Sequence, residues 1–419
     1  MEERIFVSGL GAVTCLGNSV ETLWTQLLAG RSGIRQLQHL DLSDLAITIG
    51  GEVDGIDASD FDDLPVVSAK RMDRAAQFAV YAAGEALRQS GLPLQGLGER
   101  AAVVLGSGLN GLLTLQEQTE RLLNRGPRAV SPLTIPLLMP NAAAANVSLA
   151  YGAQGPTQAV GTACASSGHA IISCIRMMRD GDVDVAITGG TEASLTRLGI
   201  SAFANMRAMT RKYNDRPTEA SRPFDADRDG FVMSEGAGII VIETERHLRE
   251  RGGTPLAEIV GFGTSTDAFH LVQPDESATQ ASRSMLSAVR SAGLEPQEIA
   301  GRTYVNAHGT GTPLNDKVET VGLKKVFGDA AGDLQVSSSK SMTGHMIGAA
   351  AGLESIVCIK ALETGVLPPT INYKTPDPDC DLDCIPNEPR KASVQYALNN
   401  SLGFGGHNVC LLFGRPDAD

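Results

Sequence analysis

The chain contains little of several residue types, and each shortage excludes a class of protein. Aromatic residues make up only 4% of the 419 residues, whereas glycine occurs 46 times. This proportion predicts closely packed helices and many tight turns rather than disorder. The seven cysteines are odd in number and show no repeated spacing, which argues against a disulfide framework and favours a reducing, cytoplasmic location.

Long apolar runs and an excess of positive charge are also missing. No apolar run approaches the ~18 residues that span a bilayer, and the strand-like run 5–8 follows the N-terminus without a secretory signal segment. We therefore expect no membrane association. The net charge of −13 argues against a nucleic-acid partner, which needs a clustered basic surface, but it does not exclude a local basic patch.

Strand-like runs alternate with helical patterns along the chain, which indicates an α/β fold. The chain is longer than the roughly 250–300 residues that one hydrophobic core serves, so we expect two units. Residues 5–14 and 258–266 resemble each other, because both are strands that run into a small-residue loop. This echo predicts two duplicated α/β halves, residues 1–254 and 255–419. The proline-rich segment 367–390 is interpreted as a surface loop that returns the chain to the sheet.

Three motifs resemble binding sites that other features argue against. Residues 106–111 match the dinucleotide pattern G-x-G-x-x-G but lack the acidic strand end about 20 residues later, so a tight turn that lines a pocket is favoured. Residues 225–230 resemble the start of a calcium loop, but position 12 is Gly236, and we expect carboxylates that cap backbone amides. Cys380 and Cys384 lack a second pair. We therefore expect no metal site.

Cys164 lies in a run of small residues, GTACASS, where a strand and turn meet the start of a helix. A cysteine attacks only as thiolate, and the free N–H groups and positive dipole end of a helix favour that form. The small neighbours leave room for a substrate to reach the sulfur. The alternative is a packed cysteine in a helix cap.

His308 and His345 stand in similar surroundings. The first lies in NAHGTGT after a strand-like run, and the second ends KSMTGH before an alanine-rich helix. A structural histidine usually has bulky packing partners, which both lack. One thiol and two imidazoles on tight small-residue turns are the parts of a carbon–carbon bond-forming site.

These motifs resemble the β-ketoacyl-[acyl carrier protein] synthases of the elongating I/II type, and the resemblance covers nearly the whole chain. Further matching segments are residues 7–11, 221–225, 228–231 and 400–406. The resemblance implies a thiolase-like fold, in which two duplicated α/β halves form a five-layer α-β-α-β-α sandwich, usually as a homodimer.

The resemblance also assigns roles to the conspicuous residues. Cys164 matches the nucleophile that accepts the acyl group, and His308 and His345 match the pair that assists decarboxylation of the malonyl group and stabilises the enolate oxygen. Lys340 matches the lysine that orders the histidines. Phe404 matches the gating phenylalanine, whose backbone N–H would form the oxyanion hole together with that of Cys164.

Other positions match acidic partners and substrate contacts. Asp316 and Glu319 match the family's acidic residues, and Glu319 is expected to support Lys340. Thr310 and Thr312 match the threonines that contact the phosphopantetheine arm of the acyl carrier protein. That arm carries the substrate, so the resemblance implies no bound cofactor.

Two departures from the family pattern leave the acyl chain length open. Leu109 and Asn110 occupy the acyl-pocket loop, which often reads Ile-Gly, and Leu402 stands where phenylalanine is common. The expected pathway is fatty acid synthesis. The alternative is the ketosynthase subunit of a type II polyketide synthase, which pairs with a chain-length factor in a heterodimer.

Other classes of function fit less well. An initiating synthase would use Cys-His-Asn, and a thiolase would need a second catalytic cysteine near the C-terminal glycine turn, whereas Cys410 lies later, in strand-like sequence. The intact set of cysteine, histidines and lysine argues against a scaffold subunit without activity.

Basic residues cluster at two places, although the chain as a whole is acidic. One cluster is at the start of a predicted helix and the other lies in a later stretch: Lys70, Arg71, Arg74, Arg207 and Arg211. Positive charge at a helix start opposes the helix dipole, so helix stability does not explain the first cluster. We expect these residues to dock the acidic carrier protein; the alternative is a solvated basic surface.

Overall fold

The computed structural model describes residues 3–64 and 66–416. Residues 1–2, 65 and 417–419, which belong to the two predicted halves, lie outside the described residues. The core of the protein is a ten-stranded mixed sheet in the order β10-β9-β13-β14-β8-β1-β7-β6-β4-β5. The strands of the first half are β1 Ile5–Val13, β4 Ala101–Gly106, β5 Thr157–Val160, β6 Val185–Glu192 and β7 Gly236–Thr244. Those of the second are β8 Ala257–Thr266, β9 Thr303–Asn306, β10 Gln335–Ser337, β13 Tyr396–Gly403 and β14 His407–Gly414.

The strand order repeats itself about the junction of β1 and β8. The first half reads β1-β7-β6-β4-β5 from the junction outwards, and the second reads β8-β14-β13-β9-β10. Matching pairs also run in matching directions, since β4–β6 and β9–β13 are parallel while β1–β7 and β8–β14 are antiparallel. The predicted duplication is therefore confirmed, and the boundary at residues 254 and 255 stays a prediction.

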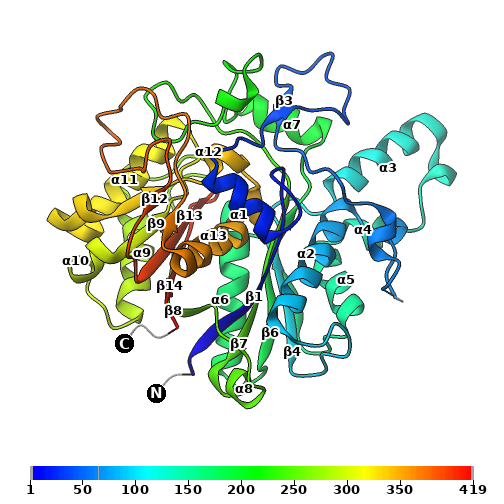
Figure 1. Cartoon of the computed structure of the whole chain (residues 1–419). Coiled ribbons are helices and arrows are strands. Elements are labelled where there is room, and N and C mark those ends of the chain that lie inside the picture. Colours follow the sequence, from blue (N-terminus) through cyan, green and yellow to red (C-terminus); the bar gives the residue numbers. More distant parts are fainter. Residues whose placement is uncertain (1–2, 65, 417–419) are drawn as a thin grey trace.

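Helices form three layers around the two halves of the sheet (Figure 1). The central helices α6 Ser166–Arg179 and α13 Ala350–Thr364 pack between the halves. The helices α2 Arg74–Ser90 and α5 Ala142–Tyr151 cover the outer face of the first half, and α9 Thr279–Ser291 and α11 Pro313–Phe327 cover that of the second. The predicted five layers are confirmed.

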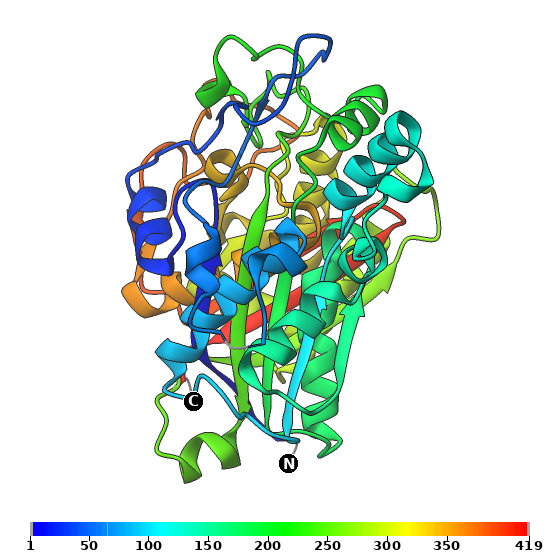
Figure 2. The ribbon, with the colours of Figure 1, turned by 90° about the vertical axis from the view of Figure 1, so that its right-hand side faces the viewer.

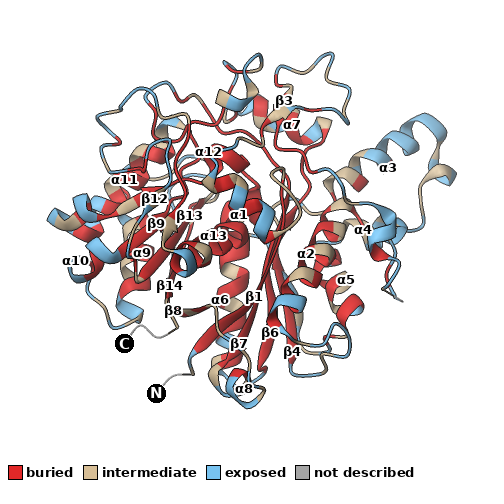
Figure 3. Cartoon of the chain, in the orientation of Figure 1, coloured by how far each residue is buried: buried red, intermediate tan, exposed pale blue. Residues whose placement is uncertain are grey.

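Burial follows this layering. The helix α13 is apolar on nearly every side and almost wholly buried, as a helix in the middle of a protein must be. Figure 3 shows the same burial for the central elements, whereas α3 Leu112–Arg125 and α10 Pro296–Ile299 expose much of their surface. Among the described residues, no helix is both long and apolar enough to cross a bilayer.

The remaining elements are short and mostly lie around the sheet. The helices are α1 Val20–Leu28, α4 Thr134–Leu138, α7 Arg197–Asn205, α8 Glu245–Glu250 and α12 Lys340–Thr343, and the strands are β2 Arg35–Gln36, β3 Ile49–Gly50, β11 Val366–Leu367 and β12 Arg390–Lys391. The proline-rich segment runs between β11 and β12 and returns the chain to the sheet through β13 and β14, as predicted. The long connections 30–60 and 206–235 gather at one end of the sheet, at the top of Figures 1 and 2.

Candidate active site

The candidate residues follow the carboxyl ends of parallel strands. The strand β5 leads to Cys164, β9 leads to His308, and β10 leads to Lys340 and His345. Because the carboxyl ends of parallel strands lie at the same edge of a sheet, β9, β10 and β13 end together in the second half. The central helical layer then packs this edge against the segment that follows β5 in the first half. Cys164, His308, His345 and Phe404 line one cavity of about 440 Å³, and Lys340 lies outside its lining.

The backbone around Cys164 holds the sulfur towards this cavity. Ala163 has a φ of 50°, in the left-handed region that non-glycine residues rarely adopt. The Ser166 hydroxyl donates to the Ala163 carbonyl at 2.6 Å and accepts from the Thr162 N–H at 2.9 Å. A sharp turn followed directly by α6 therefore positions Cys164, as the small-residue run predicted.

The thiol and the two imidazoles form one buried cluster. The Nε2 atom of His345 lies 3.0 Å from Cys164 Sγ. The rings of His308 and His345 meet edge to face, with centroids 5.3 Å apart and an interplanar angle of 86°. A nitrogen from each ring and the sulfur all lie within 4.8 Å of one another. The structure thus brings together the three side chains that the sequence singled out.

Burial, however, dominates the ionisation of Cys164. It raises the pKa of the thiol to about 11, although Lys340 and the backbone N–H groups of Phe404 and Cys164 act in the opposite direction. The N–H groups at the helix start thus favour the thiolate, as expected, but burial outweighs their effect. The same two N–H groups lie near the sulfur, where a thioester oxygen would accept their hydrogen bonds.

Both histidines are neutral at physiological pH. Burial lowers the pKa of His308 and of His345 well below the ordinary value, and the nearby positive charge of Lys340 lowers both further. A neutral imidazole carries one N–H donor and one acceptor nitrogen. His345 can thus accept the thiol proton, and either ring can donate to an oxyanion.

The partner of Lys340 differs from the predicted one. Its ammonium group pairs with the Glu354 carboxylate, and both side chains are buried. Glu319 instead accepts the backbone N–H groups of His308 and Gly309, each at 2.7 Å. Glu319 therefore fixes the histidine turn and not the lysine, and burial raises its pKa to about 7.

Sequence reasoning missed Glu354. It lies on α13 and is the one acidic residue among the helix's buried positions. A carboxylate in an otherwise apolar helix has to find a charged partner, because an unpaired buried charge is costly. That signal was present in the sequence, but it does not reveal which lysine is the partner.

Asp316 holds the loop that connects β9 to α11. Its carboxylate accepts the N–H of Gly311 at 3.2 Å and that of Phe224 at 2.9 Å, and it lies 3.6 Å from the Arg228 guanidinium. Arg228 also donates to the carbonyls of Thr312 and Pro313. The loop is thereby tied to the segment 222–228.

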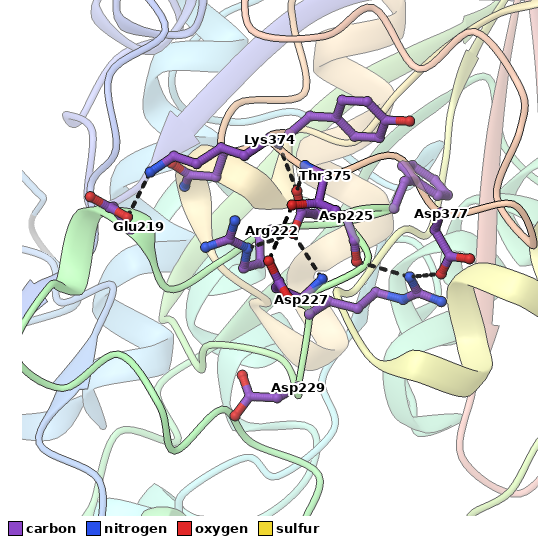
Figure 4. Close-up of polar contacts among 12 residues, drawn as sticks. Glu219, Arg222, Asp225, Asp227, Asp229, Lys374, Thr375 and Asp377 are labelled. Carbon is purple, nitrogen blue, oxygen red and sulfur yellow. Dashed lines mark hydrogen bonds and ion pairs between the residues drawn. The ribbon is translucent and has the colours of Figure 1, made fainter.

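The segment that resembled a calcium loop is a capped turn. The Asp225 carboxylate accepts the N–H groups of Asp227, Lys374 and Thr375 and the Nε–H of Arg222 (Figure 4). Arg228 donates to the Asp225 carbonyl at 2.9 Å and pairs with Asp377 at 2.5 Å, which links the turn to that residue. The Asp225 carboxylate thus caps backbone amides, as predicted, and it also pairs with Arg222.

The expected substrate contacts lie at the cavity, with one exception. Thr310 and Thr312 line it, and their hydroxyls are 3.1 Å apart. Leu109 also lines it, whereas the Asn110 side chain points elsewhere and donates to the Met139 carbonyl at 2.7 Å. Phe404 is half-buried at the cavity, with its ring 6.4 Å from that of Phe203.

The basic residues divide into two groups. Lys70, Arg71 and Arg207 are exposed. Arg74 forms a 2.6 Å ion pair with the buried Glu235 carboxylate and packs over the Phe78 ring.

This pairing gives the charge of Arg74 an internal role, so the structure does not support the docking role expected for that residue. Arg211 is exposed, but its guanidinium donates to the Ala204 carbonyl.

The comparisons with known proteins agree with this geometry. Residues 2–248 match the model of the β-ketoacyl synthase N-terminal domain, and residues 256–374 match that of the C-terminal domain. The chain is 42% identical over 417 residues to 3-oxoacyl-[acyl-carrier-protein] synthase 2 of Staphylococcus aureus (strain COL), with 99% of both chains covered.

Solved structures give the same result. The ishigamide ketosynthase/chain length factor is similar with a TM-score of 0.89 at 33% identity, over 99% of this chain and 100% of that one. A type II polyketide ketosynthase in complex with its acyl-carrier protein and bound to the hexaketide has a TM-score of 0.90 at 29% identity, with the same coverage. The chain therefore belongs to the β-ketoacyl synthase family, whose members transfer acyl groups and form carbon–carbon bonds.

Proposed function

We propose that the protein is an elongating β-ketoacyl-[acyl carrier protein] synthase of fatty acid synthesis, with Cys164 as its acyl-accepting nucleophile. The observation that carries this proposal is the 3.0 Å contact between Cys164 Sγ and His345 Nε2, beside the edge-to-face ring of His308. The full-length similarity to the Staphylococcus aureus synthase favours fatty acid synthesis over polyketide synthesis.

The first half-reaction transfers the acyl group to the enzyme. His345 Nε2 accepts the Cys164 thiol proton as the sulfur attacks the thioester carbonyl. The oxyanion that forms accepts hydrogen bonds from the backbone N–H groups of Cys164 and Phe404. The carbon–sulfur bond to the carrier then breaks, and the carrier thiolate leaves with the proton from His345. Deprotonation during attack is required because Cys164 is a thiol at rest.

The second half-reaction forms the carbon–carbon bond. The malonyl thioester loses CO2, and the enolate oxygen that results accepts hydrogen bonds from the ring N–H groups of His308 and His345. The enolate carbon attacks the acyl thioester of Cys164, and the carbon–sulfur bond to the enzyme breaks. The products are CO2 and a β-ketoacyl thioester on the second carrier. The Cys164 thiolate that leaves takes up one proton from water, so this half-reaction consumes one proton overall. Burial, together with the positive charge of Lys340, keeps both imidazoles neutral and able to act in this way.

The substrate is delivered on the phosphopantetheine arm of the carrier, and no other cofactor takes part in these steps. Thr310 and Thr312 are proposed to contact the arm, because their adjacent hydroxyls line the cavity. Lys70, Arg71 and Arg207 are proposed to dock the acidic carrier. A cytoplasmic location, without nucleic-acid or membrane partners, stays a prediction.

A second copy of the chain is the proposed subunit partner. The exposed large apolar side chains concentrate on α3, α4, α5 and the loops beside them: Leu109, Leu115, Leu122, Leu123, Leu133, Ile135, Met139 and Leu149. The strand β5 ends the sheet beside these helices. An apolar face next to an unpaired strand edge is suited to burial in a dimer.

Because the complete catalytic set does not require a second subunit type, we favour a homodimer over a heterodimer with a chain-length factor. Light scattering of the purified chain distinguishes the two, since the heterodimer proposal expects a monomer or an unstable assembly in isolation.

The test of the proposed function is intact-protein mass spectrometry. Incubation with acyl-loaded carrier protein should add one acyl group to the wild-type chain and none to Cys164→Ala. The addition of malonyl-carrier should then release a product longer by two carbons. A chain that acquires the acyl group elsewhere, or that stays acylated in the presence of malonyl-carrier, would contradict the proposal.

A further inference from the structure

Glu192 is a buried carboxylate that the mechanism above does not use. It is the last residue of β6 and has no solvent exposure. Burial raises its pKa, and hydrogen bonds from Ser194, Gly108, Gly348 and Leu109 act against that rise. Within the described part of the chain, the hydrogen-bond donors that reach Glu192 are all neutral.

The three backbone N–H donors come from two separate segments. Glu192 Oε2 accepts the Gly108 N–H at 2.8 Å and the Gly348 N–H at 3.1 Å, while Oε1 accepts the Leu109 N–H at 3.3 Å. The Ser194 hydroxyl donates to Oε1 at 2.5 Å. One carboxylate thus joins the loop after β4 to the turn before α13.

Both segments form the wall of the catalytic cavity. Gly108 and Leu109 line it on one side, and Ile347, next to Gly348, lines it beside His345. The two segments touch closely, because a Cβ placed on Gly348 would lie 2.2 Å from the Gly108 nitrogen. Ile347 has a φ of 45°, so the turn is held in a strained conformation that needs fixed partners.

We propose that Glu192 is a positioning residue, which fixes the Gly108–Leu109 wall to the segment that carries His345 and thereby sets the acyl-chain preference of the site. This inference rests on the proposed function, because it takes Leu109 as part of the acyl pocket. A neutral carboxylic acid or an amide could not satisfy all of these donors, since it presents a donor of its own to them.

The charge of Glu192 also reaches the nucleophile. The charged and titratable groups that face Cys164 are His308, His345, Lys340 and Glu192, and the negative charge of Glu192 contributes to the raised pKa of the thiol. The position of Glu192 therefore predicts an effect on acyl-chain preference, and its charge predicts an effect on the pKa of Cys164. Different substitutions can separate the two.

The test compares Glu192→Asp with Glu192→Gln. The aspartate keeps the charge but is shorter by one methylene, so it cannot hold both segments. The glutamine keeps the length but loses the charge and presents an amide N–H to the donors. The matched control is Glu243→Gln, because Glu243 has no solvent exposure either but pairs with Arg251 at the far end of β7.

The first readout is single-turnover acylation by a series of carrier proteins loaded with short to long acyl chains. We expect both Glu192 variants to change the ratio of long-chain to short-chain rates by roughly 10-fold or more, as leaving a buried N–H without a partner would. The second readout is the pH profile of Cys164 alkylation by iodoacetamide. It should shift to lower pH in Glu192→Gln and stay in place in Glu192→Asp.

A purely structural role predicts a different result. Both variants would then unfold at lower temperature, like Glu243→Gln, and would lose all chain lengths equally, with the alkylation profile unchanged; that outcome overturns the inference. If a Glu192 variant does not fold, Ser194→Ala takes its place, because it removes only one donor. It should change the ratio of long-chain to short-chain acylation rates by a smaller factor. An unchanged ratio in a folded Ser194→Ala would count against the inference.

If no acyl-loaded carrier protein acylates the wild-type chain, both the proposed function and the chain-length effect are contradicted. The pH profile of Cys164 alkylation would still show whether the charge of Glu192 acts on Cys164.

Discussion

The two halves of the molecule contribute different chemistry from equivalent positions. The strands β5 and β10 are the outermost strands of their halves, and each leads through a short segment into a helix of the central layer. In the first half this segment carries Cys164, and in the second it carries Lys340 and His345. The duplicated fold thus brings two equivalent helix starts together, one with the nucleophile and one with the groups that handle protons.

Burial shifts the pKa of the Cys164 thiol and the pKa values of the two histidines in opposite directions, but it leaves all three groups neutral. It raises the pKa of the Cys164 thiol and lowers the pKa of each histidine, because the charged form is disfavoured in both cases. The site at rest therefore holds neutral reacting groups, and the Lys340–Glu354 pair carries its charges behind them. Each reacting group acquires charge only during the reaction.

The largest expected effect comes from removing the nucleophile of the first half alone. Cys164→Ala should abolish acyl-enzyme formation and condensation, while decarboxylation of malonyl-carrier survives on His308 and His345. Mass spectrometry and CO2 release measure the two activities separately. Cys384→Ala is the control, because that cysteine is buried outside the cavity and should leave both intact. Condensation by Cys164→Ala would refute the assignment of the nucleophile.

Removing either histidine of the second half should impair decarboxylation more than acyl transfer. His308→Ala and His345→Ala should each lower decarboxylation by about 10²–10³-fold, the usual cost of one oxyanion donor. His308→Ala should still accept acyl groups, and His345→Ala should do so more slowly, because it lacks the base next to Sγ. The exposed His39 supplies the control His39→Ala. A histidine whose loss leaves decarboxylation near the wild-type rate is structural.

The pH dependence of Cys164 sharpens the electrostatic part of the comparison. With a pKa raised to about 11, the thiol should react with iodoacetamide at a rate that still rises about tenfold per pH unit near pH 9, beyond the range of an ordinary cysteine. The rise in pKa also stabilises the fold below pH ~8.5, and this contribution is lost as the pH increases towards 11. An alkylation profile that levels off near pH 7 would show a resting thiolate.

The smallest expected effect concerns the surface. Lys70→Glu, Arg71→Glu and Arg207→Glu should each raise KM for carrier-bound substrate by about 2- to 10-fold, more at low salt, since surface charges act through association and are screened. Acylation from a small soluble thioester should not change. Lys391→Glu, an exposed lysine on β12, is the control. An equal loss with both substrates would mean that the residues support the fold and not docking.

The sequence predicted the elements and the reacting residues well, because each has a local signal. Glycine-rich turns after strand-like runs marked Cys164, His308 and His345. The helix predicted beside the first basic cluster is α2, which begins at Arg74 after the Asp73 cap. The errors concern pairing. Lys340 was matched to Glu319 and binds Glu354, and Arg74 was placed on the surface and pairs with Glu235.

The sequence by itself determined the kind of protein: an α/β chain in two similar halves, with one reactive thiol and two imidazoles on small-residue turns. These features follow from residue types and short spacings, which propensity and periodicity control. Only the tertiary structure decided which charges meet and what burial does to them. The Lys340–Glu354 pair, the un-ionised thiol and the bridge at Glu192 all depend on desolvation and on contacts between distant segments, and no local pattern encodes these.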